Sequence, residues 1–130
     1  RARGVEIGTR DTTPGAGAHM SFLAQLLKAQ SVVEVGTGSG VGSLWLLEGM
    51  LSSGTLTSID DEMEHSSIAR MAFADAEIAA ARFRLITNPV MEVMTKLTDR
   101  AYDLVIYRHN PEDLVYAISE AQRICEVVEC

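Results

Sequence analysis

Cysteines, basic residues and long apolar runs are all scarce in this chain of 130 residues. Its 2 cysteines, Cys125 and Cys130, form neither a metal-spaced cluster nor a disulfide framework, so we expect reduced thiols and a cytoplasmic location. No apolar run approaches the ~20 residues of a membrane-spanning helix, and we expect no secretory signal. The 11 Lys and Arg residues are outnumbered by 18 Asp and Glu residues, which argues against nucleic acid or a membrane surface as the partner.

Metal-binding and phosphate-binding signatures are also lacking. His19, His65 and His109 are too far apart to form the i, i+3 or i, i+4 pairs of a metal site, so we predict no bound metal. A P-loop is excluded because no Gly-Lys-Ser/Thr follows the glycine-rich stretch. The hydrophobic fraction of 47% fits a single globular domain over residues 1–130.

The most informative stretch is residues 31–40, which read SVVEVGTGSG. Its β-branched run favours a strand that is buried on both faces and that carries one acid, Glu34. The alternating glycines that follow carry no Cβ, so that backbone amides can approach a ligand closely. A helical segment over 41–51 then directs its N-terminal amides to the same place. Strand, glycine turn and helix together predict the first unit of a nucleotide-type cofactor site.

A second strand-like run at 54–60, GTLTSID, also ends in an acid. Asp60 follows the last glycine by about 20 residues, the offset of a carboxylate that accepts the hydroxyls of a ribose. Its charge would repel a 2′-phosphate, which disfavours NADP. The alternative is that Asp60, Asp61 and Glu62 only begin a helix, because acids suit a first turn. Both roles are compatible.

The glycine spacing departs from the dinucleotide fingerprint G-x-G-x-x-G/A. The third small residue would fall on Val41 when counted from Gly36 and on Ser43 when counted from Gly38, and neither register fits. The glycine spacing therefore disfavours the third interpretation, an NAD-dependent oxidoreductase.

Four segments in order resemble the class I S-adenosylmethionine-dependent methyltransferases, and within them the catechol O-methyltransferase-like bacterial O-methyltransferases. The similarity extends from about Gly15 to Ala121. The matching segments are 33–40 (the first motif), 56–60 (the ribose-binding strand), 82–94 (the adenine-flanking segment) and 101–107 (the fourth strand, beside the reaction centre).

The resemblance implies S-adenosylmethionine as the cofactor and assigns a role to each matching position. Residues of the first motif would line the methionine portion, Asp60 would hold the ribose, and an apolar segment would border the adenine. Asn88 stands where the family usually has glycine, and asparagine tolerates a left-handed backbone. The expected cofactor-binding residues are Glu34, Gly36, Thr37, Gly38, Gly40, Ser43, Asp60, Asp61, Pro89 and Val90, with Met91 beside them.

The departures from the family concern the metal. Its metal-dependent members carry an aspartate directly after the fourth strand, where Arg108 stands here, and a guanidinium has no lone pair to offer a cation. The family's later Asp-Asn pair is absent, and Pro111 stands at about the place of a lysine that some members use as a base. The chain therefore predicts a cofactor half of the site without the divalent-metal half.

Two residues of the same loop are candidates for chemistry. Arg108, if turned outward, could bind a carboxylate or phosphate of the acceptor; the alternative is a surface arginine on a degenerate site. His109 titrates in the range useful for removing a hydroxyl proton from the acceptor; the alternative is a solvated loop histidine.

Strands that alternate with helices predict an α/β fold with a Rossmann-like, doubly wound, mostly parallel sheet in a three-layer α/β/α arrangement. The family topology implies the strand order 3-2-1-4 and a complete sheet of seven strands. Because only four strands are clear here, we expect the chain to lack its C-terminal strands. It also starts without Met, so we expect it to be part of a longer protein. The expected segments are a loop at 12–18, helices at 19–29, 41–51 and 111–124, strands at 32–35, 83–86 and 104–107, and a stub at 126–130.

The helical periodicity predicts which side chains face the core. The methionines and Trp45 fall on helical stripes and are expected to be core residues. The expected inward positions are Phe22, Leu23, Leu26 and Leu27 in the first helix, Ile68, Met71, Ala72, Ala76 and Ala79 in the long middle helix, Met91, Met94 and Leu97 in the short helix, and Leu114, Val115 and Ile118 in the last.

The leading hypothesis is an S-adenosylmethionine-dependent O-methyltransferase that acts on a small hydroxylated acceptor without a divalent metal. The alternative is a catalytically inactive cofactor-binding or scaffold protein of the same fold. Relatives commonly form homodimers, so a dimer is expected as well. The sequence does not identify the acceptor.

Overall fold

The β-branched runs form a parallel sheet whose five strands follow the order β3-β2-β1-β4-β5. The computed structural model describes residues 12–125 and 128–129. The helices and strands are α2 (Pro14–Leu26), β1 (Ser31–Val35), α3 (Val41–Gly49), β2 (Thr55–Asp60), α4 (Met63–Asp75), the 3-10 turn η1 (Ala80–Arg82), β3 (Phe83–Thr87), α5 (Val90–Lys96), β4 (Leu104–Tyr107), the 3-10 turn η2 (Pro111–Asp113), α6 (Leu114–Ile124) and β5 (Val128–Glu129).

The predicted order 3-2-1-4 is confirmed, because β1 lies between β2 and β4. In the register of the sheet Val33 is paired with Thr57 on one side and with Val105 on the other. The expected stub is present as β5, which pairs with β4 in parallel. Cys130 and residues 126–127 lie outside the described residues. The direction of winding reverses at β1 and β4, so the carboxyl ends of these two strands form the edge where α/β folds bind ligands.

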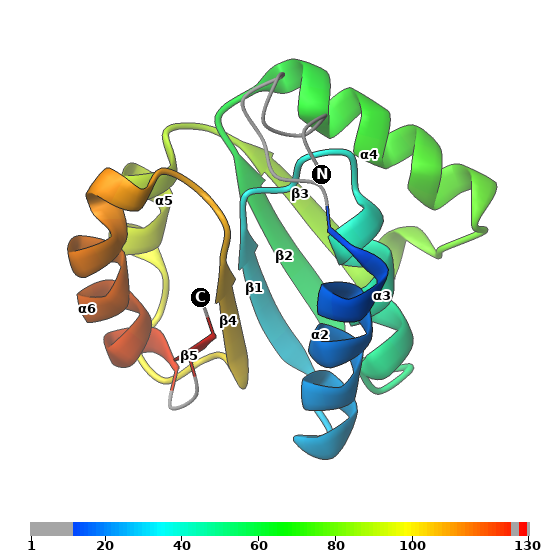
Figure 1. Cartoon of the computed structure of the whole chain (residues 1–130), viewed down its shortest axis with the longest axis horizontal. Coiled ribbons are helices and arrows are strands. Elements are labelled where there is room, and N and C mark those ends of the chain that lie inside the picture. Colours follow the sequence, from blue (N-terminus) through cyan, green and yellow to red (C-terminus); the bar gives the residue numbers. More distant parts are fainter. Residues whose placement is uncertain (1–11, 126–127, 130) are drawn as a thin grey trace.

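Helices cover both faces of the sheet, which confirms the three-layer arrangement. Figure 1 shows α2, α3 and α4 on one side of the strands and α5 and α6 on the other. Alternate residues of β1 point into the two cores: Val32 joins Leu46 and Phe73, whereas Val33 joins Met94 and Ile124. No helix of the described residues is long and apolar enough to cross a membrane.

The segment expected to be a loop at 12–18 is mostly helix, because α2 begins at Pro14. Thr13 caps it: its side-chain oxygen accepts a hydrogen bond from the amide of Ala16 at 3.1 Å. Proline at the first helical position lacks only an amide hydrogen that would be unpaired there. The Thr-Pro pair is therefore a helix start, and the glycines after it belong to the helix.

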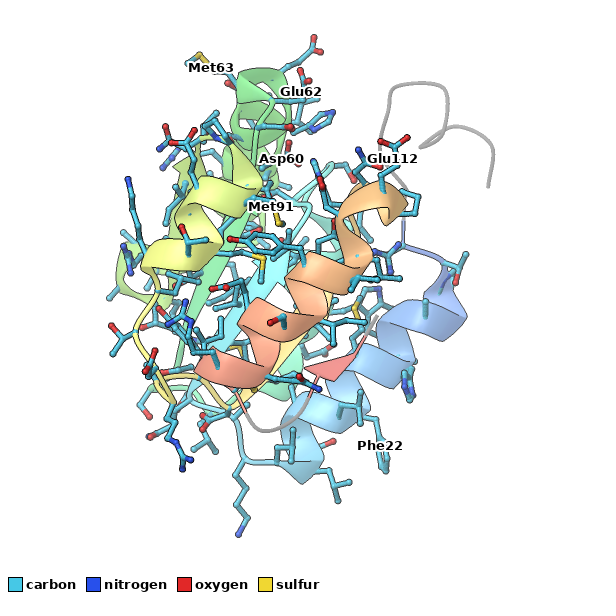
Figure 2. The ribbon with its side chains drawn as sticks, turned by 90° about the vertical axis from the view of Figure 1, so that its left-hand side faces the viewer. Phe22, Asp60, Glu62, Met63, Met91 and Glu112 are labelled. Carbon is cyan, nitrogen blue, oxygen red and sulfur yellow. The ribbon has the colours of Figure 1, made fainter. Side chains whose placement is uncertain are left out.

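The expected inward face of α2 is confirmed only in part, because Leu23 packs against the core but the other three expected positions are exposed. Phe22 and Leu26 are 58% and 66% exposed, Leu27 is also exposed, and Figure 2 shows Phe22 pointing away from the molecule. The helix buries Gly17, Met20 and Ala24 instead. A Cβ at Gly17 would overlap the ring of Trp45 of α3, so small residues let the two helices approach closely. Backbone proximity decided which face is inside, not the size of the apolar side chains.

The expected inward stripe of α4 is wrong at Ile68 and Met71, and that of α6 is confirmed in part, because Leu114 packs against the core. Met71 and Ile68 are 68% and 44% exposed and Met63 is 73% exposed, whereas His65, Ser66, Ala69 and Phe73 are buried. Ala76 and Ala79 follow the end of α4. In α6, Val115 is 83% exposed, and the buried residues are Ala117, Ala121 and Ile124. In α4, polar contacts to the strand ends set the rotation of the helix, as described below.

Candidate functional site

A turn of three glycines, all with positive φ, lies at the carboxyl end of β1. Gly36 has a φ of +101°, and a Cβ there would overlap the carbonyl oxygen of Arg108, in the loop after β4. Gly40 has a φ of +92°, and its Cβ would lie 3.0 Å from the Cβ of Ala69 in α4. Only glycine tolerates this backbone and these close contacts. The glycine turn therefore lies between the β4 loop and α4.

The acid predicted in β1, Glu34, is buried beneath this turn, with 1% of its surface exposed. Its Oε1 accepts hydrogen bonds from the hydroxyl of Ser43 and, at 2.8 Å, from the hydroxyl of Ser58. The hydroxyl groups of Ser58 and Thr37 are in turn 2.7 Å apart. The network joins β1, β2, the glycine turn and the first turn of α3.

Burial raises the pKa of Glu34 to about 7. The hydrogen bonds from Ser43 and Ser58 and the positive charge of Arg108 oppose this rise in pKa, and the charge of Asp60 adds to it. The carboxyl group therefore changes charge near neutral pH, and Arg108 lies close enough to influence it.

The second predicted acid, Asp60, ends β2 and is also 1% exposed. Its Oδ2 accepts a hydrogen bond from the amide of Gly38 at 3.1 Å, and its Oδ1 accepts one from the amide of Glu62 at 2.9 Å. The Nδ1 atom of His65 lies 3.1 Å from both oxygens. Asp60 thus connects the glycine turn to the start of α4. Asp60 itself belongs to β2, and α4 begins only at Met63, so the alternative that Asp60 lies in the first turn of the helix is wrong.

Two members of this network were missed in the sequence, Ser58 and His65. Ser58 stands between Thr57 and Ile59 in β2, and nothing local distinguishes it from an ordinary strand serine. His65 was considered only as a metal ligand. Its signal is the spacing of five residues from Asp60, which brings the first turn of the following helix back over the strand end.

The segment predicted to border the adenine follows β3 and adjoins Asp60. The amide of Asn88 donates to the carbonyl oxygen of Asp60 at 3.1 Å. Asn88 is not among the described non-glycine residues with positive φ, so a left-handed turn is not used there. Val90 is buried and Pro89 is exposed. Met91 lies at the same end of the molecule as Asp60, opposite Phe22 (Figure 2).

The loop after β4 supplies the more exposed side of the site. The amide of Arg108 donates to the carbonyl oxygen of Val35 at 2.8 Å, which fixes the loop against β1. His109 has its Nε2 atom 3.4 Å from Oδ1 of Asp61, whose side chain is 43% exposed. The Nδ1 atom of His109 is buried and has no hydrogen-bond partner among the described residues.

The described residues contain no group of three His, Cys, Asp or Glu side chains arranged to hold a metal ion. The position expected to hold a metal-binding aspartate carries the Arg108 guanidinium, which cannot coordinate a cation. The arrangement brings together the predicted first-motif residues, Asp60 and the β4 loop at one edge of the sheet.

A family model described as a methyltransferase domain matches residues 33–125. The "Putative O-methyltransferase" of Mycobacterium sp. (strain JLS) is 48% identical over 124 residues, which are 95% of this chain and 56% of that protein. The chain thus spans about half the length of the curated relatives it matches.

Solved structures have the same fold. A protein from Corynebacterium glutamicum is 26% identical and superimposes with a TM-score of 0.85 over 94% of this chain and 58% of its own. The O-methyltransferase TomG of Streptomyces achromogenes, solved in complex with SAM, is 21% identical, with a TM-score of 0.81 over 88% of this chain and 52% of its own.

Proposed function

The chain belongs to the methyltransferase-domain family, and from that premise we propose that it binds S-adenosylmethionine and methylates an oxygen of a small hydroxylated acceptor without a divalent metal. The observation that carries the proposal is the pair of buried acids, Glu34 and Asp60, on either side of the glycine turn. Two carboxylates at a turn of closely approaching amides suit a ligand that carries a ribose and positive charge.

The residues present fit this cofactor, which would supply a methyl group on a sulfonium. The glycine turn and Glu34 would hold its methionine portion. Asp60 would accept hydrogen bonds from the ribose hydroxyls, with Asp61 beside it, and Pro89 and Val90 would border the adenine. The SAM complex of TomG, which has the same fold, supports the choice of ligand.

The β4 loop is the proposed acceptor side. His109 would take the acceptor's hydroxyl proton as a general base, and Asp61, whose Oδ1 lies 3.4 Å from Nε2 of His109, would stabilise the imidazolium that forms. Arg108 would bind an anionic group of the acceptor, a role that competes with its attraction to Glu34. Holding the acceptor in line with the methyl group would supply several kcal/mol of the catalysis.

Calorimetric titration of the full-length protein with S-adenosylhomocysteine, with magnesium and with EDTA, tests the proposal. We expect binding that is equal in both buffers. Binding that requires magnesium would overturn the metal-free part of the proposal. A folded protein that binds no S-adenosylhomocysteine would overturn the cofactor assignment.

Asp60→Ala is expected to weaken this binding about tenfold, because it removes a charged hydrogen-bond acceptor from the ribose. Asp75→Ala, at the exposed end of α4, is the matched control and should leave the affinity unchanged. Undiminished binding by Asp60→Ala would contradict the assigned role.

His109→Ala is expected to lower the rate of methyl transfer about 100-fold and to leave S-adenosylhomocysteine affinity unchanged. The measurement is single-turnover transfer to a panel of phenols. An unchanged rate with a responsive acceptor would show that His109 is a solvated loop histidine.

A further inference from the structure

The histidine on α4 has no part in the proposed reaction, yet it is built into the site. His65 is 5% exposed and lies in the first turn of the helix that follows Asp60. Its Nδ1 atom faces the Asp60 carboxylate symmetrically, at 3.1 Å from each oxygen. An ionised carboxylate only accepts hydrogen bonds, so this contact requires the proton of the imidazole on Nδ1.

Three donors hold the Asp60 carboxylate from three elements. The amide of Gly38 comes from the glycine turn, the amide of Glu62 from the β2–α4 connection, and His65 from the helix itself. The two amides bind different oxygens and so fix the rotation of the carboxylate about its Cβ–Cγ bond. His65 contacts both oxygens at once and holds the carboxylate in position from the side of α4.

A fixed carboxylate matters for recognising neighbouring hydroxyls. The two hydroxyl oxygens of one ribose lie at a set spacing, and an acceptor that is already oriented loses less freedom on binding both hydroxyls. A second anchor supports this rotation of α4, since Ser66 and Thr87 have their hydroxyl oxygens 2.6 Å apart. Together these contacts explain why α4 buries His65 and Ser66 and leaves Ile68 and Met71 exposed.

We propose that His65 is a positioning residue, which orients the Asp60 carboxylate so that the site discriminates a ribose from a deoxyribose. This inference rests on the proposed function, because it takes Asp60 to be the acceptor of the ribose hydroxyls. His65 itself acts only through Asp60.

The test compares the affinity of the full-length protein for S-adenosylhomocysteine with its affinity for the 2′-deoxy analogue, by calorimetry. We expect the wild type to prefer the ribose ligand by about tenfold, the effect of one hydrogen bond to a charged group. His65→Leu should reduce this preference to about threefold or less. His65→Asn, which keeps an N–H near the position of Nδ1, should restore most of it. Ser67→Leu, exposed on the same helix, is the control and should keep the wild-type ratio.

Each other outcome overturns the inference. An equal loss of affinity for both ligands would mean that His65 only supports the fold. Tighter binding of the ribose ligand by His65→Leu would mean that His65 competes with the hydroxyls. A wild type that binds S-adenosylhomocysteine but does not distinguish it from the deoxy analogue would remove the inference alone, whereas a wild type that binds neither would remove the proposed function as well.

A measurement on the wild type keeps the inference testable if His65→Leu does not fold. The nitrogen NMR shift of His65 Nδ1 must be that of a protonated nitrogen in the folded protein. An unprotonated Nδ1 could not donate to Asp60 and would overturn the inference.

Discussion

The two halves of the site differ in how their side chains are held. The β1–β2 half (Glu34, the glycine turn and Asp60) is buried, and each acid has at least two hydrogen-bond donors. The β4 half (Arg108, His109 and the start of α6) is partly exposed, and its His109–Asp61 contact is long, at 3.4 Å. A side chain with several buried hydrogen-bond partners cannot be substituted without a loss of folding stability. Residues of a half-exposed loop can be substituted with little loss of folding stability, so the β4 half is the one where acceptor specificity can vary.

Gly36→Ala is expected to have the largest effect on stability, because Gly36 lies where the two halves of the site contact each other. The substitution combines a φ of +101° with overlap between the new Cβ and the Arg108 carbonyl. We expect a loss of unfolding free energy on the order of 4 kcal/mol, measured by urea denaturation. The control is Gly15→Ala in α2, where a Cβ would meet nothing within 4 Å and should be neutral or slightly stabilising. Similar stabilities for the two variants would contradict the tight packing of the turn.

Glu34→Gln tests the buried half through the pH dependence of its folding stability. The ordinary carboxyl pKa of 4.5 is raised to about 7 in the folded protein, so the folded state keeps a proton that the unfolded chain has already lost. Glu34 therefore lowers stability progressively as pH rises from about 4.5 to about 7, and the full loss persists above that range. Glutamine does not titrate and still accepts the hydrogen bonds of Ser43 and Ser58.

The unfolding free energy of Glu34→Gln minus that of the wild type should consequently increase over that pH range. The total increase should be about 3 kcal/mol. Urea denaturation at several pH values measures the difference, and groups unaffected by the substitution cancel. The same variant should bind S-adenosylhomocysteine more weakly, because the ligand's ammonium loses a carboxylate. A difference in stability that does not change with pH would contradict the raised pKa.

Val105→Ala and Val115→Ala test the comparison with the same chemical change and the smallest expected effects. Val105 is fully buried in β4 and should lose about 2 kcal/mol of unfolding free energy. Val115 is 83% exposed at the start of α6 and should change it by less than about 0.5 kcal/mol. A large loss at Val115 would show that a partner covers this face, as the expected homodimer could.

Much of the fold could be predicted from local patterns. The strands at 31–35, 55–60 and 104–107 agree with their expected positions. Each is a β-branched run, and the turn residues on either side mark where the strand begins and ends. The glycine turn, both acids and the loop at 108–109 likewise come together at the predicted edge of the sheet. The inward face of α5 agrees with its prediction, with Met94 buried and Met91 and Leu97 packed against the core. The faces of the other helices could not be predicted in the same way, because Phe22, Met71 and Val115 fit an apolar stripe but are exposed.

The sequence by itself determined the alternation of strands and helices, the glycine turn and the two acids that follow their strands. These features depend on neighbouring residues, whose steric preferences act within a few positions along the chain. Only the tertiary structure decided that α2 packs through Gly17, that α4 turns His65 toward Asp60, and that both acids are buried. These outcomes depend on how closely two backbones can approach and on which distant polar group needs a partner, and neither is encoded in the period of a single helix.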